Sequence, residues 1–389
     1  MGRGRRARGA RGELPRGLRQ GPRRVARLRR GRELDHARAP LRVDLGGPPH
    51  RRARVDAVDR GIGDGPRGAG AGEPGGEGGA GLSVETPKEH LALWSFRLVA
   101  WLARTLPERI GRRAFDAFGR LAYRLLPGVR ATVAANQAMV LGQDPGSDLV
   151  ASATKEAFSL YARYWFDTFR ARILPVAELN ARTVTEGIDH IDRALEGGKG
   201  CITVLPHMGN WDVAGRWLAA NDYRIASVAE ELRPRKLFEL FLEHREALGM
   251  KIIPLTKDGH VGQQLGALLG QNWIVALVAD RDLTGRGVEV EMFGAPRKLP
   301  AGPALLSLST GAPLMVCPVW TTDRGWKIRI GAALEIERTG DMRADVTALT
   351  QRMAAEFERA IAARPVDWHM FQPAWESRLG PGGADGLGP

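Results

Sequence analysis

The sequence has only two cysteines, Cys201 and Cys317, among its 389 residues. Two cysteines are too few for a disulfide framework, and both lie in apolar stretches, where a cysteine usually serves as a small buried hydrophobe. A run of about 18 uncharged apolar residues is also missing, which argues against a membrane-spanning helix. The basic first residues lack the apolar segment of a signal peptide. We therefore expect a protein of a reducing compartment.

Lysine and aromatic residues are absent from residues 1–85, which contain 20 Arg, 20 Gly and 7 Pro against 10 acidic residues. This segment holds ten of the thirteen net positive charges of the chain. With so few large apolar side chains it cannot bury enough surface to offset the entropy of ordering. We expect a disordered extension over residues 1–85, one folded domain over residues 86–378 and a flexible tail over residues 379–389.

Three interpretations of this extension compete. It could bind nucleic acid, anchor the chain to anionic lipid, or be an extension without function that arises from a misassigned start of translation in GC-rich DNA. A functional basic arm normally mixes Lys with Arg, and nucleic-acid tails carry aromatic residues or regular Arg-Gly-Gly spacing. Because all of these are missing, the composition favours the extension without function.

Apolar residues at helical spacing predict three N-terminal helices, near residues 91–102, 110–125 and 148–172. The first is amphipathic, with Trp94 and Trp101 among its apolar residues and basic residues interleaved. Such a helix either packs on the domain or lies in the interface of a bilayer. The sequence leaves both possibilities open.

Short apolar runs then alternate with longer amphipathic stretches, which is typical of an α/β fold. A closing helix is expected over residues 341–363. The fold class that we predict is α/β, with a central, mostly parallel sheet flanked by helices and preceded by the N-terminal helices. The expected strands are residues 201–205, 225–229, 251–254, 274–278, 314–319 and 326–330.

His207 and Asp212 lie where the first of these strands stops at Pro206 and a helix begins. Strand ends that open into helix starts are where open α/β sheets place their sites. A carboxylate five positions on could fold back to bind one imidazole nitrogen, which would leave the other as a general base. Gly209 would permit close approach of a substrate, and the amides at the helix start could bind a developing oxyanion. A His-x4-Asp spacing alone is weak, and a buried structural histidine is the alternative.

Two further polar segments follow predicted strands. The first begins at Asp280 and runs as a polar, Gly-rich loop through Asp282 and Arg286 to Gly294, a candidate site whose simplest alternative is a solvated loop with internal ion pairs. The second starts at Glu230 and contains several basic residues, with Arg245 one helix later. These basic side chains could bind phosphates, or they could form a charged helix face. No Cys or His pair has metal-ligand spacing, and no Gly-x-Ser-x-Gly elbow occurs.

The turn and several other motifs resemble the glycerolipid acyltransferase superfamily, whose signature is His-x4-Asp at a strand-to-helix turn. They are most similar to its lipid A acyltransferase branch, and within that branch to acyltransferases of phosphatidylinositol mannosides. The resemblance covers roughly residues 88–376. The segments that carry it are His-Met-Gly-Asn-Trp-Asp at 207–212, Ala-Asp-Arg-Asp-Leu-Thr at 279–284, Pro-Ala-Gly-Pro-Ala at 300–304, Thr-Gly-Ala-Pro at 310–313 and Asp-Trp-His-Met-Phe-Gln at 367–372.

The resemblance implies a glycerol-3-phosphate-acyltransferase-like fold and transfer of a fatty acyl group from acyl-CoA to a mannose hydroxyl of a phosphatidylinositol mannoside. It implies a peripheral protein at the cytoplasmic face of the plasma membrane, with acyl-CoA as co-substrate and with no further cofactor, metal or nucleic acid. His207 would be the general base, Asp212 its support, and Asp280 the acidic residue that completes the site. Asp282 and, more distantly, Glu289 remain alternatives to Asp280.

Residues expected to contact the substrates come partly from the resemblance and partly from the turn itself. They are Arg245, Glu230, Asp282, Arg286, Gly209 and Asn210. No nucleophilic Ser or Cys accompanies His207, so direct transfer without a covalent acyl-enzyme is expected. The Ala- and Gly-rich stretch over residues 301–319 could line an acyl-chain groove. The alternatives are a different glycolipid or lysophospholipid acceptor, or a non-enzymatic nucleic-acid-binding protein that uses the Arg-rich arm.

Overall fold

The computed structural model of the chain describes residues 87–231, 234–255, 260–283 and 285–375. The extension predicted over residues 1–85 and the tail predicted over residues 379–389 lie outside these ranges. Within them the α/β fold class is confirmed, because a five-stranded, all-parallel sheet is flanked by helices on both faces.

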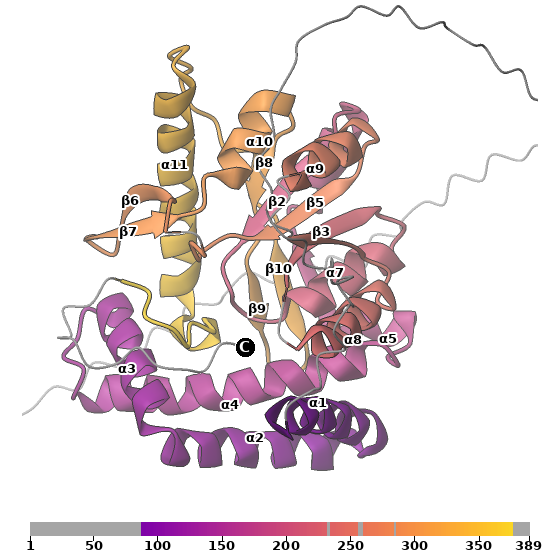
Figure 1. Cartoon of the computed structure of the whole chain (residues 1–389), viewed down its shortest axis with the longest axis vertical. Coiled ribbons are helices and arrows are strands. Elements are labelled where there is room, and N and C mark those ends of the chain that lie inside the picture. The colour runs from indigo at the N-terminus through magenta and orange to yellow at the C-terminus, as the bar shows by residue number, and fades with distance from the viewer. Residues whose placement is uncertain (1–86, 232–233, 256–259, 284, 376–389) are drawn as a thin grey trace, which may run out of the picture. The chain divides into compact units, whose positions relative to one another are not determined.

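The region where three N-terminal helices were predicted holds four in the described part of the chain (Figure 1): α1 (Pro87–Thr105), α2 (Glu108–Leu125), α3 (Pro127–Leu141) and α4 (Asp148–Ala171). The missed helix, α3, follows α2 after a single residue and starts with Pro127 at its first position, where the absent N–H leaves no hydrogen bond unmade. Its composition is rich in Ala and Val and lacks a clear polar face, so periodicity gave no signal.

The central sheet has the strand order β4-β3-β5-β2-β8. Its strands are β2 (Cys201–Leu205), β3 (Ile225–Glu230), β4 (Lys251–Leu255), β5 (Ile274–Val278) and β8 (Leu314–Val316). Alternate residues face opposite sides, so that Ile202 and Val275 join one apolar core while Cys201 and Ile274 join the other. Burial on both faces explains why these strands read as continuous apolar runs.

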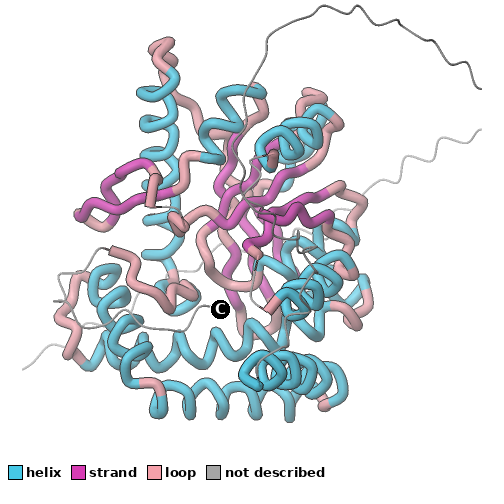
Figure 2. Tube along the Cα trace, viewed as in Figure 1, coloured by secondary structure: helices cyan, strands magenta, loops and turns pink. Residues whose placement is uncertain are grey.

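Helices cover both faces of this sheet, as Figures 1 and 2 show. The helices α9 (Val261–Gly270), α10 (Gly302–Thr310) and α11 (Met342–Ala363) pack on one face. On the other face lie α6 (Ile188–Glu196), α7 (Trp211–Ala220) and α8 (Arg235–Glu246), and α5 (Val176–Arg182) packs against α7. The closing helix predicted over residues 341–363 is confirmed, with Asp341 as its N-cap.

Two smaller sheets accompany the central one. A three-stranded sheet has the order β1-β10-β9, built from β1 (Thr183–Glu186), β9 (Val319–Thr321) and β10 (Trp326–Arg329). The single strand predicted over residues 314–319 is wrong, because Pro318 has no N–H for a ladder and divides it into β8 and β9 in different sheets. A hairpin of β6 (Val288–Met292) and β7 (Ala295–Leu299) occupies part of what the sequence had suggested was a loop.

Helix α4 packs closely against α2 at a glycine. A Cβ placed on Gly119 would come within 2.6 Å of the Phe158 carbonyl oxygen and 2.8 Å of the Ser159 Cα. Both are backbone atoms that cannot swing aside. A glycine at this position therefore lets the two helix backbones approach each other.

We expect Gly119→Ala to destabilise the protein by about 1–3 kcal/mol, because the added methyl group must push α2 away from α4. Gly128→Ala is the matched control, since a Cβ there meets no atom of the described residues within 4 Å. That helical substitution should be neutral or stabilising by up to about 1 kcal/mol. Urea unfolding of both variants measures the difference, and equal effects would contradict the close approach.

Candidate active site

Strands β2 and β5 are neighbours and end in register. Leu205 pairs with Val278, and the Ala279 amide donates to the Leu205 carbonyl at 3.0 Å. His207 and Asp280 each lie two residues beyond this last pair, so the two parallel strands deliver them to the same place. The candidate site is therefore set by the sheet register.

His207 and Asp280 form a tight pair. One oxygen of Asp280, Oδ1, lies 2.5 Å from His207 Nδ1, and the other, Oδ2, accepts the His207 backbone N–H at 3.0 Å. The imidazole is about one quarter exposed, whereas the carboxylate is fully buried. A hydrogen bond from Nδ1–H to the carboxylate would leave Nε2 as the nitrogen with a free lone pair.

Asp280 has further partners. Trp368 Nε1 donates to Oδ2 at 2.8 Å, and the Arg297 guanidinium donates to the Asp280 backbone carbonyl. Burial alone would raise the pKa of this carboxyl. The charge of His207 when it is protonated, its hydrogen bond, the charge of Arg297 and the hydrogen bond from Trp368 outweigh burial and hold the pKa well below its usual range. Asp280 is therefore ionised throughout the physiological range.

Asp212 does not make the predicted contact with the imidazole, and this expectation is wrong. Its Oδ2 accepts the Tyr164 hydroxyl at 2.7 Å, and its Oδ1 accepts Arg245 Nε at 2.8 Å. As a first-turn residue of α7, Asp212 points toward α4 and α8, while the carboxylate on the ring comes from β5. Of the acidic residues considered for the second position, it is Asp280 that contacts His207, rather than Asp282 or Glu289.

The turn between His207 and α7 is fixed by Gly209 and Asn210. Gly209 has φ +59°, and a Cβ there would come within 2.2 Å of the Val319 carbonyl oxygen, so its role is close packing of backbone. Its amide donates to the Asp367 carbonyl at 2.9 Å and is therefore not available to an oxyanion.

Asn210, predicted to contact substrate, is 1% exposed and caps α7 by accepting the Val213 N–H at 3.0 Å. Its amide nitrogen donates to the Tyr164 carbonyl at 3.0 Å. All of this hydrogen bonding stays within the protein. The predicted contact of Asn210 with substrate is accordingly replaced by a structural role.

An apolar cavity of about 70 Å³ lies beneath the turn, between the sheet and α7. Asp212 and Arg245 lie in its wall, together with mostly apolar side chains such as Leu205, Ile225 and Val278. The stretch over residues 301–319 contributes Cys317 and Val319, whereas α10 packs on the opposite face of the sheet. The groove predicted from that stretch is therefore built mainly by other residues.

Burial raises the pKa of the Cys317 thiol, and no negatively charged sulfur is favoured in this cavity. Arg245 behaves in the opposite way. Burial alone would lower the pKa of its guanidinium, but Asp212 and Tyr164 raise it, so the cation is held firmly at the cavity wall.

A polar cleft of about 550 Å³ opens beside Asp280. It runs between residues 280–283 and 285, the β6–β7 hairpin and residues 370–375, and Arg281, Lys298 and Gln372 contribute to its walls. Asp282 and Glu289 also line this cleft, and Asp282 accepts the Gly287 N–H at 2.6 Å.

The other predicted contact residues lie on the surface. Arg286 is exposed in the loop before β6, and Glu230 is the exposed last residue of β3. Neither lines the apolar cavity or the polar cleft. Within the described ranges, no group of three or more His, Cys, Asp or Glu side chains is arranged to hold a metal ion.

Residues 367–369 of the C-terminal segment bind the turn at His207 through backbone contacts, and no chemical motif in the sequence pointed to them. Met208 and Trp368 form an antiparallel bridge, and the His369 amide donates to the His207 carbonyl at 2.6 Å. His369 Nε2 lies 3.0 Å from the Gly209 carbonyl, so this nitrogen carries the proton. The segment lies about 160 residues from the turn in sequence, and only the family resemblance marked it.

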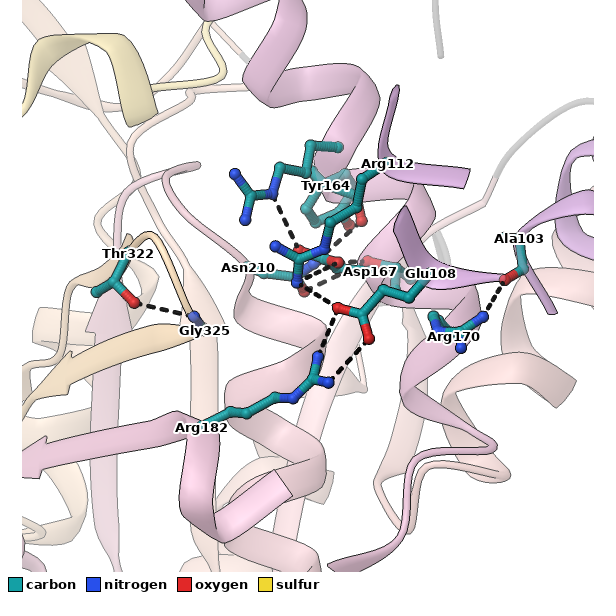
Figure 3. A network of polar contacts seen from close by, with 12 residues as sticks. Ala103, Glu108, Arg112, Tyr164, Asp167, Arg170, Arg182, Asn210, Thr322 and Gly325 are labelled. Atoms are coloured by element: carbon teal, nitrogen blue, oxygen red, sulfur yellow. Dashed lines mark hydrogen bonds and ion pairs between the residues drawn. The ribbon is translucent and has the colours of Figure 1, made fainter. Parts of the chain in front are cut away.

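A charged network joins α2, α4 and α5 (Figure 3). Arg182 binds both oxygens of Glu108 at 2.7 and 2.8 Å, and Arg112 lies 3.0 Å from Glu108 and 3.8 Å from Asp167. Burial raises the pKa of Asp167 to about 6, although Arg112 opposes this change. Asp167 belongs to α4, the helix that also supplies Tyr164.

The chain is similar in sequence to a family of known proteins. The family described as bacterial lipid A biosynthesis acyltransferase matches residues 81–377. A phosphatidylinositol mannoside acyltransferase of Mycobacterium tuberculosis (strain H37Rv) is 39% identical over 292 residues, which cover 74% of this chain and 89% of that protein. One of Mycolicibacterium smegmatis is 38% identical over 279 residues, or 72% of this chain and 89% of that protein.

The buried His369 makes stability depend on pH in a defined direction. Burial lowers its pKa from 6.5 to about 3, so the unfolded chain takes up a proton that the folded protein does not. Its contribution is fully present above pH 6.5 and is lost as the pH falls from about 6.5 toward 3. At pH 5 the loss should be about 2 kcal/mol relative to pH 7.5.

We expect His369→Gln, which keeps an N–H donor but cannot titrate, to remove this part of the pH dependence. Urea unfolding at pH 7.5 and pH 5 measures it. Burial also lowers the pKa of His244, but that residue is present in both proteins and cancels. An unchanged difference between the two pH values would show that His369 is not responsible.

Proposed function

The chain belongs to the bacterial lipid A biosynthesis acyltransferase family and is an acyltransferase, and from this premise we propose that it acylates a phosphatidylinositol mannoside. The donor is acyl-CoA and the acceptor is a mannose hydroxyl. The observation that carries the proposal is the pair of His207 and ionised Asp280 at the end of β2 and β5, with an apolar cavity lined by Asp212 and Arg245 and a polar cleft lined by Asp280.

His207 acts as the general base in the proposed reaction. Its Nε2 takes the proton of the mannose hydroxyl as the oxygen attacks the thioester carbonyl carbon. The C–S bond then breaks, and the CoA thiolate leaves with that proton. Asp280 keeps the proton of the ring on Nδ1 and stabilises the imidazolium that forms in between.

The apolar cavity is the proposed place of the acyl chain. A drug-sized ligand pocket has roughly 300–1,000 Å³, so the side chains around the cavity of about 70 Å³ must move apart to admit a long chain. Arg245, held in the cavity wall by Asp212, is placed to bind the polar end of the thioester substrate. Asp212 thus supports catalysis through Arg245. The cleft beside Asp280 would receive polar parts of the substrates.

Direct transfer fits this site better than a covalent acyl-enzyme. Cys317 lines the cavity, but the raised pKa of its thiol makes it a poor nucleophile. Within the described part of the chain, the His207 ring hydrogen-bonds to Asp280 and to no serine. The attacking group is then the sugar itself.

We propose further that α1 and α2 bind the cytoplasmic face of the plasma membrane peripherally. One side of α1 packs on α4 and α8, where the Phe96 ring contacts Phe169 and Phe241, so the helix is part of the folded domain. Its other side exposes apolar residues, and α2 does the same: Leu91 (71%), Trp94 (72%), Leu98 (50%), Trp101 (59%), Ile110, Phe118, Leu121 and Leu125.

Basic residues accompany this apolar surface. Helix α2 carries five arginines against two carboxylates, and α1 carries three basic residues against one acidic residue. Amphipathic basic helices with tryptophan suit the interface of an anionic bilayer. None of the helices in the described part of the chain is long and apolar enough to cross a membrane.

The enzymatic proposal predicts that His207→Ala and Asp280→Asn each lower kcat at least about 10³-fold. Transfer of palmitoyl from palmitoyl-CoA to a purified phosphatidylinositol mannoside measures this. His190→Gln is the control, since its ring contacts the Ile330 carbonyl rather than Asp280, and it should retain activity. Near wild-type transfer by His207→Ala would refute the assignment.

The same assay separates the alternatives. Lysophospholipids and other glycolipids, offered side by side, test whether the acceptor is a phosphatidylinositol mannoside.

A chain starting at Ser83 should keep acyl transfer. If the arginine-rich arm instead makes this a nucleic-acid-binding protein, that truncation would abolish a salt-dependent binding activity.

The membrane proposal predicts that Trp94→Ser with Trp101→Ser weakens binding to vesicles containing anionic lipid at least about tenfold, because two large apolar side chains no longer enter the interface. Co-sedimentation at low and high salt measures binding. Leu305→Ser on α10, a similarly exposed apolar residue outside α1 and α2, is the control and should bind normally. Equal loss in both proteins would contradict a surface formed by α1 and α2.

A further inference from the structure

The Asp280 carboxylate has two oxygens with separate tasks. Oδ1 binds the His207 ring, and Oδ2 accepts the His207 backbone N–H at 3.0 Å and the Trp368 indole N–H at 2.8 Å. Two fixed donors on one oxygen prevent the group from rotating about its Cβ–Cγ bond. The oxygen that remains is the one directed at the imidazole.

We propose that Trp368 is a positioning residue of the acyl transfer, which holds the Asp280 carboxylate in the orientation that orients the His207 imidazole. This inference rests on the proposed function for its activity measurement and on geometry for the rest. Trp368 itself lies behind Asp280 at 1% exposure and acts on the substrate only through the carboxylate and the imidazole.

Trp368 is held by backbone bonds to the turn that it serves. It bridges Met208, and its neighbours bind on either side: the Gly209 amide donates to the Asp367 carbonyl at 2.9 Å, and the His369 amide donates to the His207 carbonyl at 2.6 Å. The C-terminal segment and the turn therefore move as one unit. The indole position is fixed relative to His207 independently of Asp280.

Arg297 completes the support. Its guanidinium lies 5.3 Å from the ring centre of Trp368 and from that of Trp375, and it donates to the Asp280 backbone carbonyl. A cation over the face of an indole is attracted to the ring, which keeps the ring plane in place. Arg297 fixes the main chain of Asp280, while Trp368 fixes its side chain.

The chemical type of the donor also matters. An indole N–H only donates, whereas a hydroxyl, an amide or an imidazole can also accept. A partner that could accept would allow Asp280 to carry a proton toward it. The donor-only indole leaves the carboxylate as a pure acceptor, which is the state that keeps the Nδ1 proton on His207.

We expect Trp368→Phe to lower kcat about 10- to 100-fold, the usual effect of removing a hydrogen bond to a charged group. KM for palmitoyl-CoA should stay within about twofold, because Trp368 lines neither the cavity nor the cleft. Trp326→Phe is the matched control: this indole is also buried, and its N–H has no partner among the described residues. It should keep kcat within about twofold.

A double-mutant cycle with Asp280→Asn tests the route of the effect. If Trp368 acts through the carboxylate, Trp368→Phe should add little once Asp280 is Asn. Full multiplication of the two losses would overturn the proposal, as would a Trp368→Phe enzyme with unchanged kcat.

A measurement without activity separates this proposal from the proposed function. The His207 Nδ1 proton should give a downfield proton resonance, identified by its loss in Asp280→Asn, and it should shift or broaden in Trp368→Phe but stay in place in Trp326→Phe. If Trp368→Phe does not fold, 3-benzothienylalanine at position 368 keeps the ring size and removes only the N–H. An unmoved resonance in that protein would overturn the proposal even if the chain transferred no acyl group.

Discussion

The buried charge of Asp280 is the constraint on which the site depends. A carboxylate taken out of water is strongly unfavourable unless charges and hydrogen bonds compensate it. Here the compensation comes from three separate parts of the chain: His207 after β2, Arg297 in β7 and Trp368 near the C-terminus. Because each partner is needed by the same charge, the sheet, the hairpin and the C-terminal segment have to meet at one point. A structure that loses this meeting point would leave a carboxylate buried without partners.

Helix α4 connects this point to the surface of α1 and α2. Both helices pack on α4, and Arg170 of α4 donates to the carbonyls of Ala103 and Leu106 at the end of α1. Further along the same helix, Tyr164 binds Asp212 through its hydroxyl and Asn210 through its carbonyl. A single rigid element therefore touches both the exposed apolar helices and the turn that carries His207. This fixes the distance between them, as an enzyme acting on a lipid at an interface would require.

The sequence predicted the parts of the site that depend on local pattern. The bounds of β2 and β5 followed from apolar runs, and their parallel pairing brings His207 beside Asp280. The partner of Asp212 was missed, because sequence spacing suggested a short return to His207, whereas Tyr164 and Arg245 approach from helices 48 residues before it and 33 residues after it. The β6–β7 hairpin was also missed: its alternating Val-Glu-Val-Glu-Met is a strand pattern, but it directly follows a charged, Gly-rich stretch that is typical of a loop. The contacts of Asp212 with Tyr164 and Arg245 span too many residues to leave a local signal in the sequence.

The two aspartates near His207 have different partners and lie in different surroundings. Asp280 faces the polar cleft and contacts the ring of His207, while Asp212 faces the apolar cavity and binds Arg245. A thioester has the same division, with a polar carrier on one side of its carbonyl and an apolar chain on the other. If the carbonyl lies at the boundary between cavity and cleft, the base and the cation reach it from different directions. His207 then lies in the turn before α7 and Asp212 in the first turn of that helix, and the partner of the base is supplied by the end of the adjacent strand.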